Sequence, residues 1–362
     1  MKPVLVVAGT RPEIIKMAPI IKALNRTKTP SIFVHCGQNY DYDITKKFIE
    51  ELEIPTPDFS FRIESTSTGL QTAEMFSKLN HLFETVEPSI VLVEGDTNSV
   101  LAAAIAANKW MLPIGHVEAG LRSFDLRMPE EHNRRLTDHI SGYLFAPTER
   151  AKANLKKEKA WGKIFLTGNT VIDAVMQHLP CAEKKSTITE RILFKEFALV
   201  TTNRPENVDH ATILNSLMEA FLSSPIPIVY LMNPRTRKRL LENNLLAKIE
   251  TSNNLQILPP QSFSDFLVLM KNCRLIITDS GCIQEEATTP SIRKPTIVTR
   301  LSTERPEAVE AGFAKVVGTD SENILAAIDE IERNGPEMPY VSPFGDGTAA
   351  QKTVSILKEN LL

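Results

Sequence analysis

The chain has 362 residues, of which 42% are hydrophobic and 23% are charged, and its formal net charge is −3. This length is enough for two domains of ordinary size, each with its own core. The weak negative charge argues against nucleic-acid or membrane-surface binding as a bulk property, so any anion site must be local. No apolar run approaches the roughly 20 residues that a membrane-spanning helix needs.

The cysteines point to a reducing compartment. Cys36, Cys181, Cys273 and Cys282 lie far apart, without the spacing of a metal site. No charged and apolar signal segment precedes the first expected strand. We therefore expect a cytoplasmic protein with no bound metal.

The first expected strand and helix are joined by a glycine-containing turn. An apolar strand at residues 3–8 runs into Gly9, Thr10 and Arg11, and a helix is expected over residues 14–24. Thr10 could cap this helix, while Arg11 and Lys16 add positive charge near an end that already favours anions. The pattern predicts a phosphate-binding turn, although a generic strand and helix with surface cations explains it equally well.

The next expected strand, residues 31–35, leads into a polar loop at 37–42 that contains Gln38. Its hydrogen-bonding groups suit a sugar. Residues 44–88 then read as helical and irregular, without a clear strand pattern.

Three acidic side chains are expected at one edge of the sheet. The buried strand patterns at 89–93 and 112–117 lead into Asp96 and Glu118, respectively. A proline suited to a helix start places Glu130 in the first turn of the following helix. Because ligands bind outside the carboxyl ends of parallel strands, we expect these acids to converge there.

Strand and helix patterns alternate in two separate stretches. Residues 1–172 give six or seven strands, a charged segment with a proline follows, and residues 186–348 give a second alternation. The strands expected in the second stretch are 197–202, 227–231, 255–258, 275–278, 295–299 and 314–317. The pattern predicts an α/β protein of two Rossmann-like domains facing a cleft, followed by a last helix at about residues 349–362.

A second phosphate-type turn follows the expected strand at 275–278. Backbone amides of Ser280, Gly281 and Cys282 could hold a diphosphate, and Glu285 or Glu286 could accept hydrogen bonds from a ribose. A capped helix with acidic residues in its first turn would explain the same sequence without a ligand.

Arginines also recur at the strand ends of the second stretch. Arg204, Arg235 and Arg305 each follow an expected strand. Their recurrence predicts a basic cleft rather than three isolated surface charges.

The chain carries a long ordered series of motifs. They are G-T-R-P-E at 9–13, G-D-T at 95–97, H-V-E-A-G-L-R at 116–122, P-E-E at 129–131, T-G-N-T-V-I-D at 167–173 and D-S-G at 279–281. Together they resemble the non-hydrolysing UDP-N-acetylglucosamine 2-epimerases over nearly the whole length. The resemblance implies a glycosyltransferase-B-like fold, a last helix that packs back on the first domain, a cytoplasmic homodimer, and interconversion of UDP-GlcNAc and UDP-ManNAc without NAD or another cofactor.

The resemblance also implies a mechanism and a set of site residues. A base removes the C2 proton, UDP leaves C1 to give 2-acetamidoglucal, and the intermediate is reprotonated on its other face before UDP returns. Asp96, Glu118 and Glu130 match the family's acidic catalytic positions, with the first base unassigned. The expected substrate-binding residues are Arg11, Lys16, Gln38, Asn203, Arg204, Ser280, Gly281, Cys282, Glu286 and Arg305.

The chain departs from the family pattern at three positions. Asn203 stands where a histidine tied to nucleotide binding and catalysis is common, and Cys282 stands where glycine is usual. Asn233 replaces a histidine that is linked in bacterial members to an allosteric UDP-GlcNAc site. Asparagine cannot exchange a proton near neutral pH, so we expect these changes to alter the rate and the allosteric activation.

Three other functions compete with this interpretation. An epimerase for a related sugar, such as UDP-2,3-diacetamido-glucuronate, would need an extra cation near Gln38 to bind the carboxylate of the sugar, and the sequence shows none. A glycosyltransferase would leave three converging acids unexplained. A low-activity nucleotide-sugar sensor would fit Asn203 in place of the family histidine.

Overall fold

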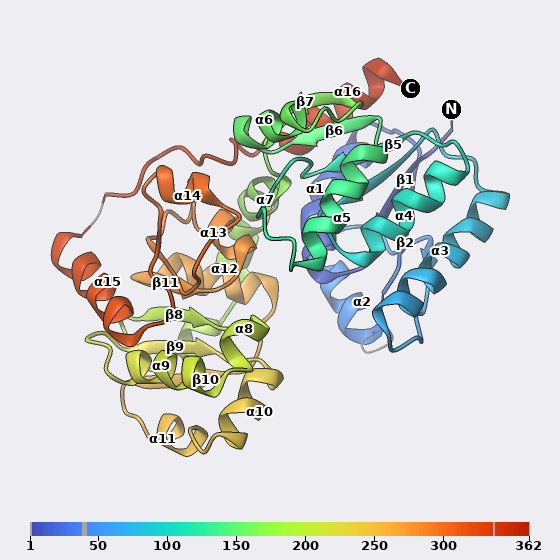
Figure 1. The fold of residues 1–362 in the computed structure, drawn as a ribbon. Coiled ribbons are helices and arrows are strands. Elements are labelled where there is room, and N and C mark those ends of the chain that lie inside the picture. The colour runs from blue at the N-terminus through green and yellow to red at the C-terminus, as the bar shows by residue number, and fades with distance from the viewer. Residues whose placement is uncertain (1, 38–41, 336, 362) are drawn as a thin grey trace. The chain divides into compact units, whose positions relative to one another are not determined.

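The computed structural model describes residues 2–37, 42–335 and 337–361. The chain divides into two compact units, shown in Figure 1. Unit 1 comprises the residues up to Ala174 together with those from Phe344 onward, and unit 2 comprises Val175–Pro343. The change from one unit to the other falls inside helix α7, Thr170–Lys185.

Unit 1 is built on a parallel sheet of seven strands in the order β3-β2-β1-β4-β5-β6-β7. The strands are β1 Val4–Ala8, β2 Ser31–His35, β3 Phe59–Ser60, β4 Ile90–Glu94, β5 Ile114–Val117, β6 Tyr143–Ala146 and β7 Lys163–Leu166. Its other helices are α1 Arg11–Arg26, α2 Tyr42–Glu51, α3 Thr68–Thr85, α4 Asn98–Lys109, α5 Pro129–Ile140, α6 Glu149–Lys157 and α16 Ala349–Asn360. The strand order reverses between β1 and β4, which is the switch point where open α/β sheets bind ligands.

Successive side chains along the central strands of unit 1 point to opposite faces of the sheet, so each face has its own packing. Leu5 and Val7 of β1 and Val91 and Val93 of β4 share one core cluster with side chains of α3 and α4. The alanines of α4 allow this helix to lie close to the sheet. Helix α16, red in Figure 1, packs against α1.

Unit 2 repeats the same topology with six strands in the order β10-β9-β8-β11-β12-β13. The strands are β8 Ala198–Thr201, β9 Ile228–Leu231, β10 Leu255–Leu258, β11 Leu275–Thr278, β12 Thr296–Val298 and β13 Ala314–Val316. The helices are η1 Ile188–Arg191, α8 Pro205–Val208, α9 Ala211–Leu222, α10 Pro234–Glu242, α11 Leu246–Glu250, α12 Phe263–Asn272, α13 Gly281–Glu286, α14 Pro306–Glu310 and α15 Ser321–Asn334. Here the order reverses between β8 and β11.

The two parallel sheets confirm the predicted fold class of two Rossmann-like α/β domains. Two local expectations were wrong. Helix α1 begins at Arg11, three residues before the expected start, because Pro12 is tolerated in a first helical turn. The short edge strand β3 was not expected, since only Phe59 and Ser60 pair with β2.

Candidate functional site

A buried carboxylate joins the turns after β1 and β4 at the switch point of unit 1. Glu13 accepts hydrogen bonds from the Gly9 amide at 2.8 Å and from the hydroxyls of Thr10 and Thr97, each at 2.7 Å. Burial raises the pKa of Glu13, and these hydrogen bonds offset only part of the effect. Thr10 therefore donates to Glu13 instead of capping α1, so the expected side-chain cap is absent.

Glycine is required at position 9 because a side chain there would collide with Ser99. Arg11 lies on the exposed first turn of α1, where its guanidinium carbon is 4.7 Å from the ring centre of Phe48. Gln38 lies outside the described residues.

Glu118 occupies the carboxyl end of β5 in an unusual backbone conformation. Its φ of 67° is left-handed, a region that a glutamate adopts only when its surroundings hold it there. The side chain is buried, forms an ion pair with Lys16, and accepts a hydrogen bond from Nδ2 of Asn169 at 3.0 Å. Asn169 is oriented in turn, because its Oδ1 accepts a hydrogen bond from the Val171 amide at 3.0 Å.

Lys16 is a buried cation between two carboxylates. Besides Glu118, its Nζ lies 3.3 Å from Oε1 of Glu94, and only about 5% of its side chain is exposed. The interpretation of Lys16 as a surface cation is therefore wrong. The sequence analysis missed Glu94, although its place as the last residue of β4, two residues before Asp96, marked it as a strand-end acid.

Asp96 is held by α5. The Nη2 atom of Arg134 lies 2.7 Å from its carboxylate, and Asn133 donates to its main-chain oxygen at 2.9 Å. The carboxylate remains partly exposed, at 28%. Asp96 and Glu118 thus follow neighbouring strands and are both held next to cations.

The two acids at the start of α5 have different environments. Glu130 is partly exposed and, among the described residues, has no ion-pair or hydrogen-bond partner. Glu131 is fully buried, accepts hydrogen bonds from the amide and hydroxyl of Ser123 at 2.9 and 3.0 Å, and pairs with Arg134 at 2.6 Å. Glu131 therefore braces the loop before α5, whereas the carboxylate of Glu130 is available for chemistry.

A buried histidine supports the turn that precedes Asp96. Nε2 of His116 lies 2.8 Å from the Gly95 carbonyl oxygen, and Nδ1 lies 2.7 Å from Asp138. Asp138 also pairs with Arg122 at 2.7 Å. Burial raises the pKa of Asp138, but the charges and hydrogen bonds of His116 and Arg122 outweigh it and hold the pKa below its usual value. Sequence periodicity gave no signal for Asp138, which lies inside a polar helix.

In unit 2 a buried aspartate joins the ends of β8 and β11. Asp279 accepts hydrogen bonds from the amides of Asn203 at 3.0 Å and Arg204 at 2.9 Å, and from the side chain of Asn207 at 3.0 Å. Burial raises its pKa against these hydrogen bonds. The exposed side chain of Asn203 accepts a hydrogen bond from Asn233. Both family-histidine positions thus lie together, Asn203 after β8 and Asn233 after the neighbouring strand β9.

The turn after β11 does not form the expected side-chain cap. The Ser280 hydroxyl makes no capping hydrogen bond to α13, so the capped-helix alternative is wrong. Gly281 faces Glu304, whose Oε1 would lie 2.9 Å from an added Cβ. Cys282 is partly buried and forms no disulfide with the other described cysteines, and Glu286 is buried.

The three strand-end arginines of unit 2 are paired with acids. The pairs are Arg204 with Glu304, Arg235 with Asp209, and Arg305 with Glu285. Burial raises the pKa of Glu304, but the charges of the surrounding arginines prevail and hold it at about 2. Each of the three arginines thus faces an acid of unit 2, and none of them is an isolated surface charge.

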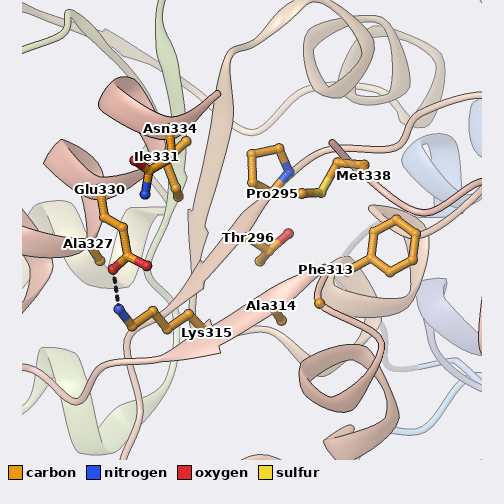
Figure 2. Close-up of a pocket in the computed structure, with 11 residues that line it drawn as sticks. Pro295, Thr296, Phe313, Ala314, Lys315, Ala327, Glu330, Ile331, Asn334 and Met338 are labelled. Carbon is orange, nitrogen blue, oxygen red and sulfur yellow. Dashed lines mark hydrogen bonds and ion pairs between the residues drawn. The ribbon is translucent and has the colours of Figure 1, made fainter. Parts of the chain in front are cut away.

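A separate pocket of about 260 Å³ lies among β12, β13 and α15 (Figure 2). The Lys315–Glu330 ion pair lies on one side of it, and Phe313 and Met338 are among its apolar lining residues. Its described lining includes none of the predicted site residues. Across the described parts of the chain, no helix has the length and apolar character to span a membrane.

Comparison with known proteins agrees with the motif series. Residues 22–358 match the family described as UDP-N-acetylglucosamine 2-epimerase. The enzyme of that name from Methanocaldococcus jannaschii is 42% identical over 97% of this chain and 98% of its own length, and that from Escherichia coli K12 is 38% identical over 99% and 98%. The chain therefore belongs to the UDP-N-acetylglucosamine 2-epimerase family.

Solved structures agree at the level of the fold. The M. jannaschii epimerase in complex with UDP-GlcNAc and UDP matches with a TM-score of 0.90 at 41% identity, covering 99% of this chain and all of that one. The Neisseria meningitidis epimerase bound to UDP-GlcNAc matches with a TM-score of 0.89 at 35% identity, with the same coverage.

Proposed function

We propose that this protein is an isomerase that interconverts UDP-GlcNAc and UDP-ManNAc. One observation carries the proposal. In a chain of this family, Glu118 is a buried carboxylate in a strained backbone conformation at a strand end, fixed by Lys16 and Asn169. Such strain is maintained at sites where a group must be positioned for chemistry.

The proposed reaction is an elimination followed by a re-addition. A carboxylate takes the C2 proton, the C1–oxygen bond breaks, UDP leaves with the bonding electrons, and a C1–C2 double bond forms. Return of a proton to the opposite face of C2 and of UDP to C1 gives the epimer. Inversion requires proton carriers on both faces of the sugar, so more than one carboxylate takes part.

The three proposed proton carriers are supported in different ways. Glu118 lies beside Lys16, whose charge favours the ionised form that a base requires. Asp96 lies beside Arg134 and is partly open to solvent. Glu130 has no competing partner among the described residues, so nothing there prevents it from exchanging protons.

We propose that unit 2 supplies the main contacts to UDP. Asn203, Arg204, Ser280, Gly281 and Cys282 follow β8 and β11, the strands between which the sheet order reverses. Glu286 and Arg305 complete this set, and Arg11, Lys16 and Gln38 of unit 1 complete the substrate contacts. The crystallised relatives from M. jannaschii and N. meningitidis bind UDP-GlcNAc, which supports the ligand class.

The family resemblance extends the proposal to a cytoplasmic homodimer that works without a cofactor. None of the four cysteines, all of which the structure describes, forms a disulfide bond, as suits a reducing compartment. Because Asn233 occupies the position linked to the allosteric UDP-GlcNAc site, we propose weaker activation by that ligand than in histidine-bearing members.

A second candidate, a nucleotide-sugar sensor, is favoured by Asn203 in place of the family histidine. Incubation with UDP-GlcNAc in deuterated water separates the two. Formation of UDP-ManNAc with deuterium at C2, followed by NMR, supports the epimerase. Tight binding with an unchanged sugar supports the sensor, and absence of binding points to a related UDP-sugar.

A further inference from the structure

Glu94 is a buried acid that the proposed reaction leaves without a role. It ends β4, is only 2% exposed, and comes two residues before Asp96. Its Oε1 atom accepts no hydrogen bond from the described residues, although Lys16 Nζ lies 3.3 Å away. A buried carboxylate oxygen without a hydrogen bond is costly when it carries charge, and much less so in a neutral acid.

The charged groups around Glu94 also favour a neutral carboxyl group. Lys16 is the one cation that the structure places against it among the described residues, and Lys16 is also paired with Glu118. Glu13 adds a third carboxyl group from α1, and its negative charge also acts on Glu94. Two neighbouring carboxylates with one cation cannot both remain ionised when they are buried.

Glu118 has the contacts that favour an ionised carboxylate. Its Oε2 receives both Lys16 and the oriented amide of Asn169. The Glu94 and Glu118 carboxyl groups are neighbours, because Nζ of Lys16 contacts both of them. Burial is the largest effect, and it raises the pKa of Glu94 well above its usual value. The negative charges of Glu118 and Glu13 raise this pKa further, whereas the positive charge of Lys16 lowers it.

We infer that Glu94 and Glu118 share a single proton, with Glu94 as the neutral donor, so that Glu94 is a positioning residue which fixes the charge and orientation of Glu118. The kinetic part of this inference rests on the proposed epimerase function. The protonation state does not, because it is a property of the resting protein.

The test compares three proteins by infrared spectroscopy at pH 8. The wild type minus Glu94→Gln difference spectrum should contain the carbonyl stretch of a protonated carboxylic acid. Asp173→Asn is the matched control, because Asp173 is another buried acid, with a pKa raised to about 6, and is ionised at pH 8. Absence of the band from the Glu94→Gln difference, or its presence in the Asp173→Asn difference alone, overturns the inference.

Kinetics test the positioning role separately. Glutamine is the neutral isostere of a protonated glutamate, so Glu94→Gln should keep kcat within about threefold. Glu94→Leu removes the hydrogen bond to Glu118, and the acid limb of its kcat profile should move upward by about one pH unit. A hundredfold loss in Glu94→Gln, with unchanged folding by circular dichroism, would overturn the positioning role. If the wild type itself fails to turn over UDP-GlcNAc, the proposed function fails while the infrared result still decides where the proton resides.

Discussion

Arg134 holds the carboxylate of Asp96 through two nitrogens, with Nε at 2.9 Å and Nη2 at 2.7 Å from Oδ2. The remaining nitrogen, Nη1, pairs with the fully buried Glu131. One guanidinium thus joins a proposed proton carrier to the carboxylate that braces the loop before α5.

We expect Arg134→Gln to lower the stability of the protein by about 3 kcal/mol, because it leaves the buried carboxylate of Glu131 with only its longer contact to Arg135 as an ion pair. Turnover should fall at least tenfold, since Asp96 loses its support. Arg135→Gln is the matched control. Its side chain is 35% exposed and its contacts with Glu131 and Glu158 are longer, at 3.4 and 3.3 Å, so its effect should stay within about 1 kcal/mol. Thermal unfolding measures both, and equal losses would show that Arg134 has no special role.

Two neighbouring substitutions separate chemistry from structure. Glu130→Gln should leave thermal stability nearly unchanged and reduce turnover at least a hundredfold, because it removes proton transfer from a partly exposed group. Glu131→Gln should destabilise the protein by about 2 kcal/mol, since Ser123 and Arg134 lose a charged acceptor. If instead Glu131→Gln abolished turnover without loss of stability and Glu130→Gln destabilised the protein, Glu131 would be the proton carrier.

Asn203→His should raise kcat about threefold to tenfold, because histidine can donate a proton near neutral pH. The position is exposed, so the larger side chain should not perturb the fold. Asn233→His, at the neighbouring position, serves as the control and should change activation by UDP-GlcNAc more than the basal rate. An unchanged or lower rate for Asn203→His would mean that the chain uses a different arrangement at this site.

Asp173 makes stability depend on pH in a defined direction. Burial raises its pKa from 3.8 to about 6. The folded state therefore binds the proton more tightly than the unfolded state, and stability should fall as pH rises from about 4 to about 6, by roughly 3 kcal/mol. The free energy of unfolding, measured with urea, should show this fall in the wild type but not in Asp173→Asn. Asp346→Asn, near the start of α16, should retain the fall, and its loss there would reject the assignment.

The sequence predicted the fold because buried parallel strands are strongly marked. Runs such as residues 89–93 are continuously apolar, as strands covered on both faces must be. The β3 pairing could not be predicted, because Phe59 and Ser60 form only a two-residue edge contact without periodicity.

The candidate site was predictable only where a residue follows a strand directly. Asp96 and Glu118 could be placed in this way, and the structure puts them just after the neighbouring strands β4 and β5. Long-range partners could not be predicted, because pairs such as His116 and Asp138 depend on tertiary packing between a strand and a helix. For the same reason the acidic partners of the arginines after β8, β9 and β12 could not be predicted, because each acid comes from another segment.

The most direct test of the account is the rate of deuterium incorporation at C2 of UDP-GlcNAc, measured for the wild type and Glu118→Gln in parallel. The account predicts incorporation by the wild type and at least a hundredfold slower incorporation by the variant, with UDP affinity within about tenfold of the wild type. Incorporation by Glu118→Gln at the wild-type rate would contradict it.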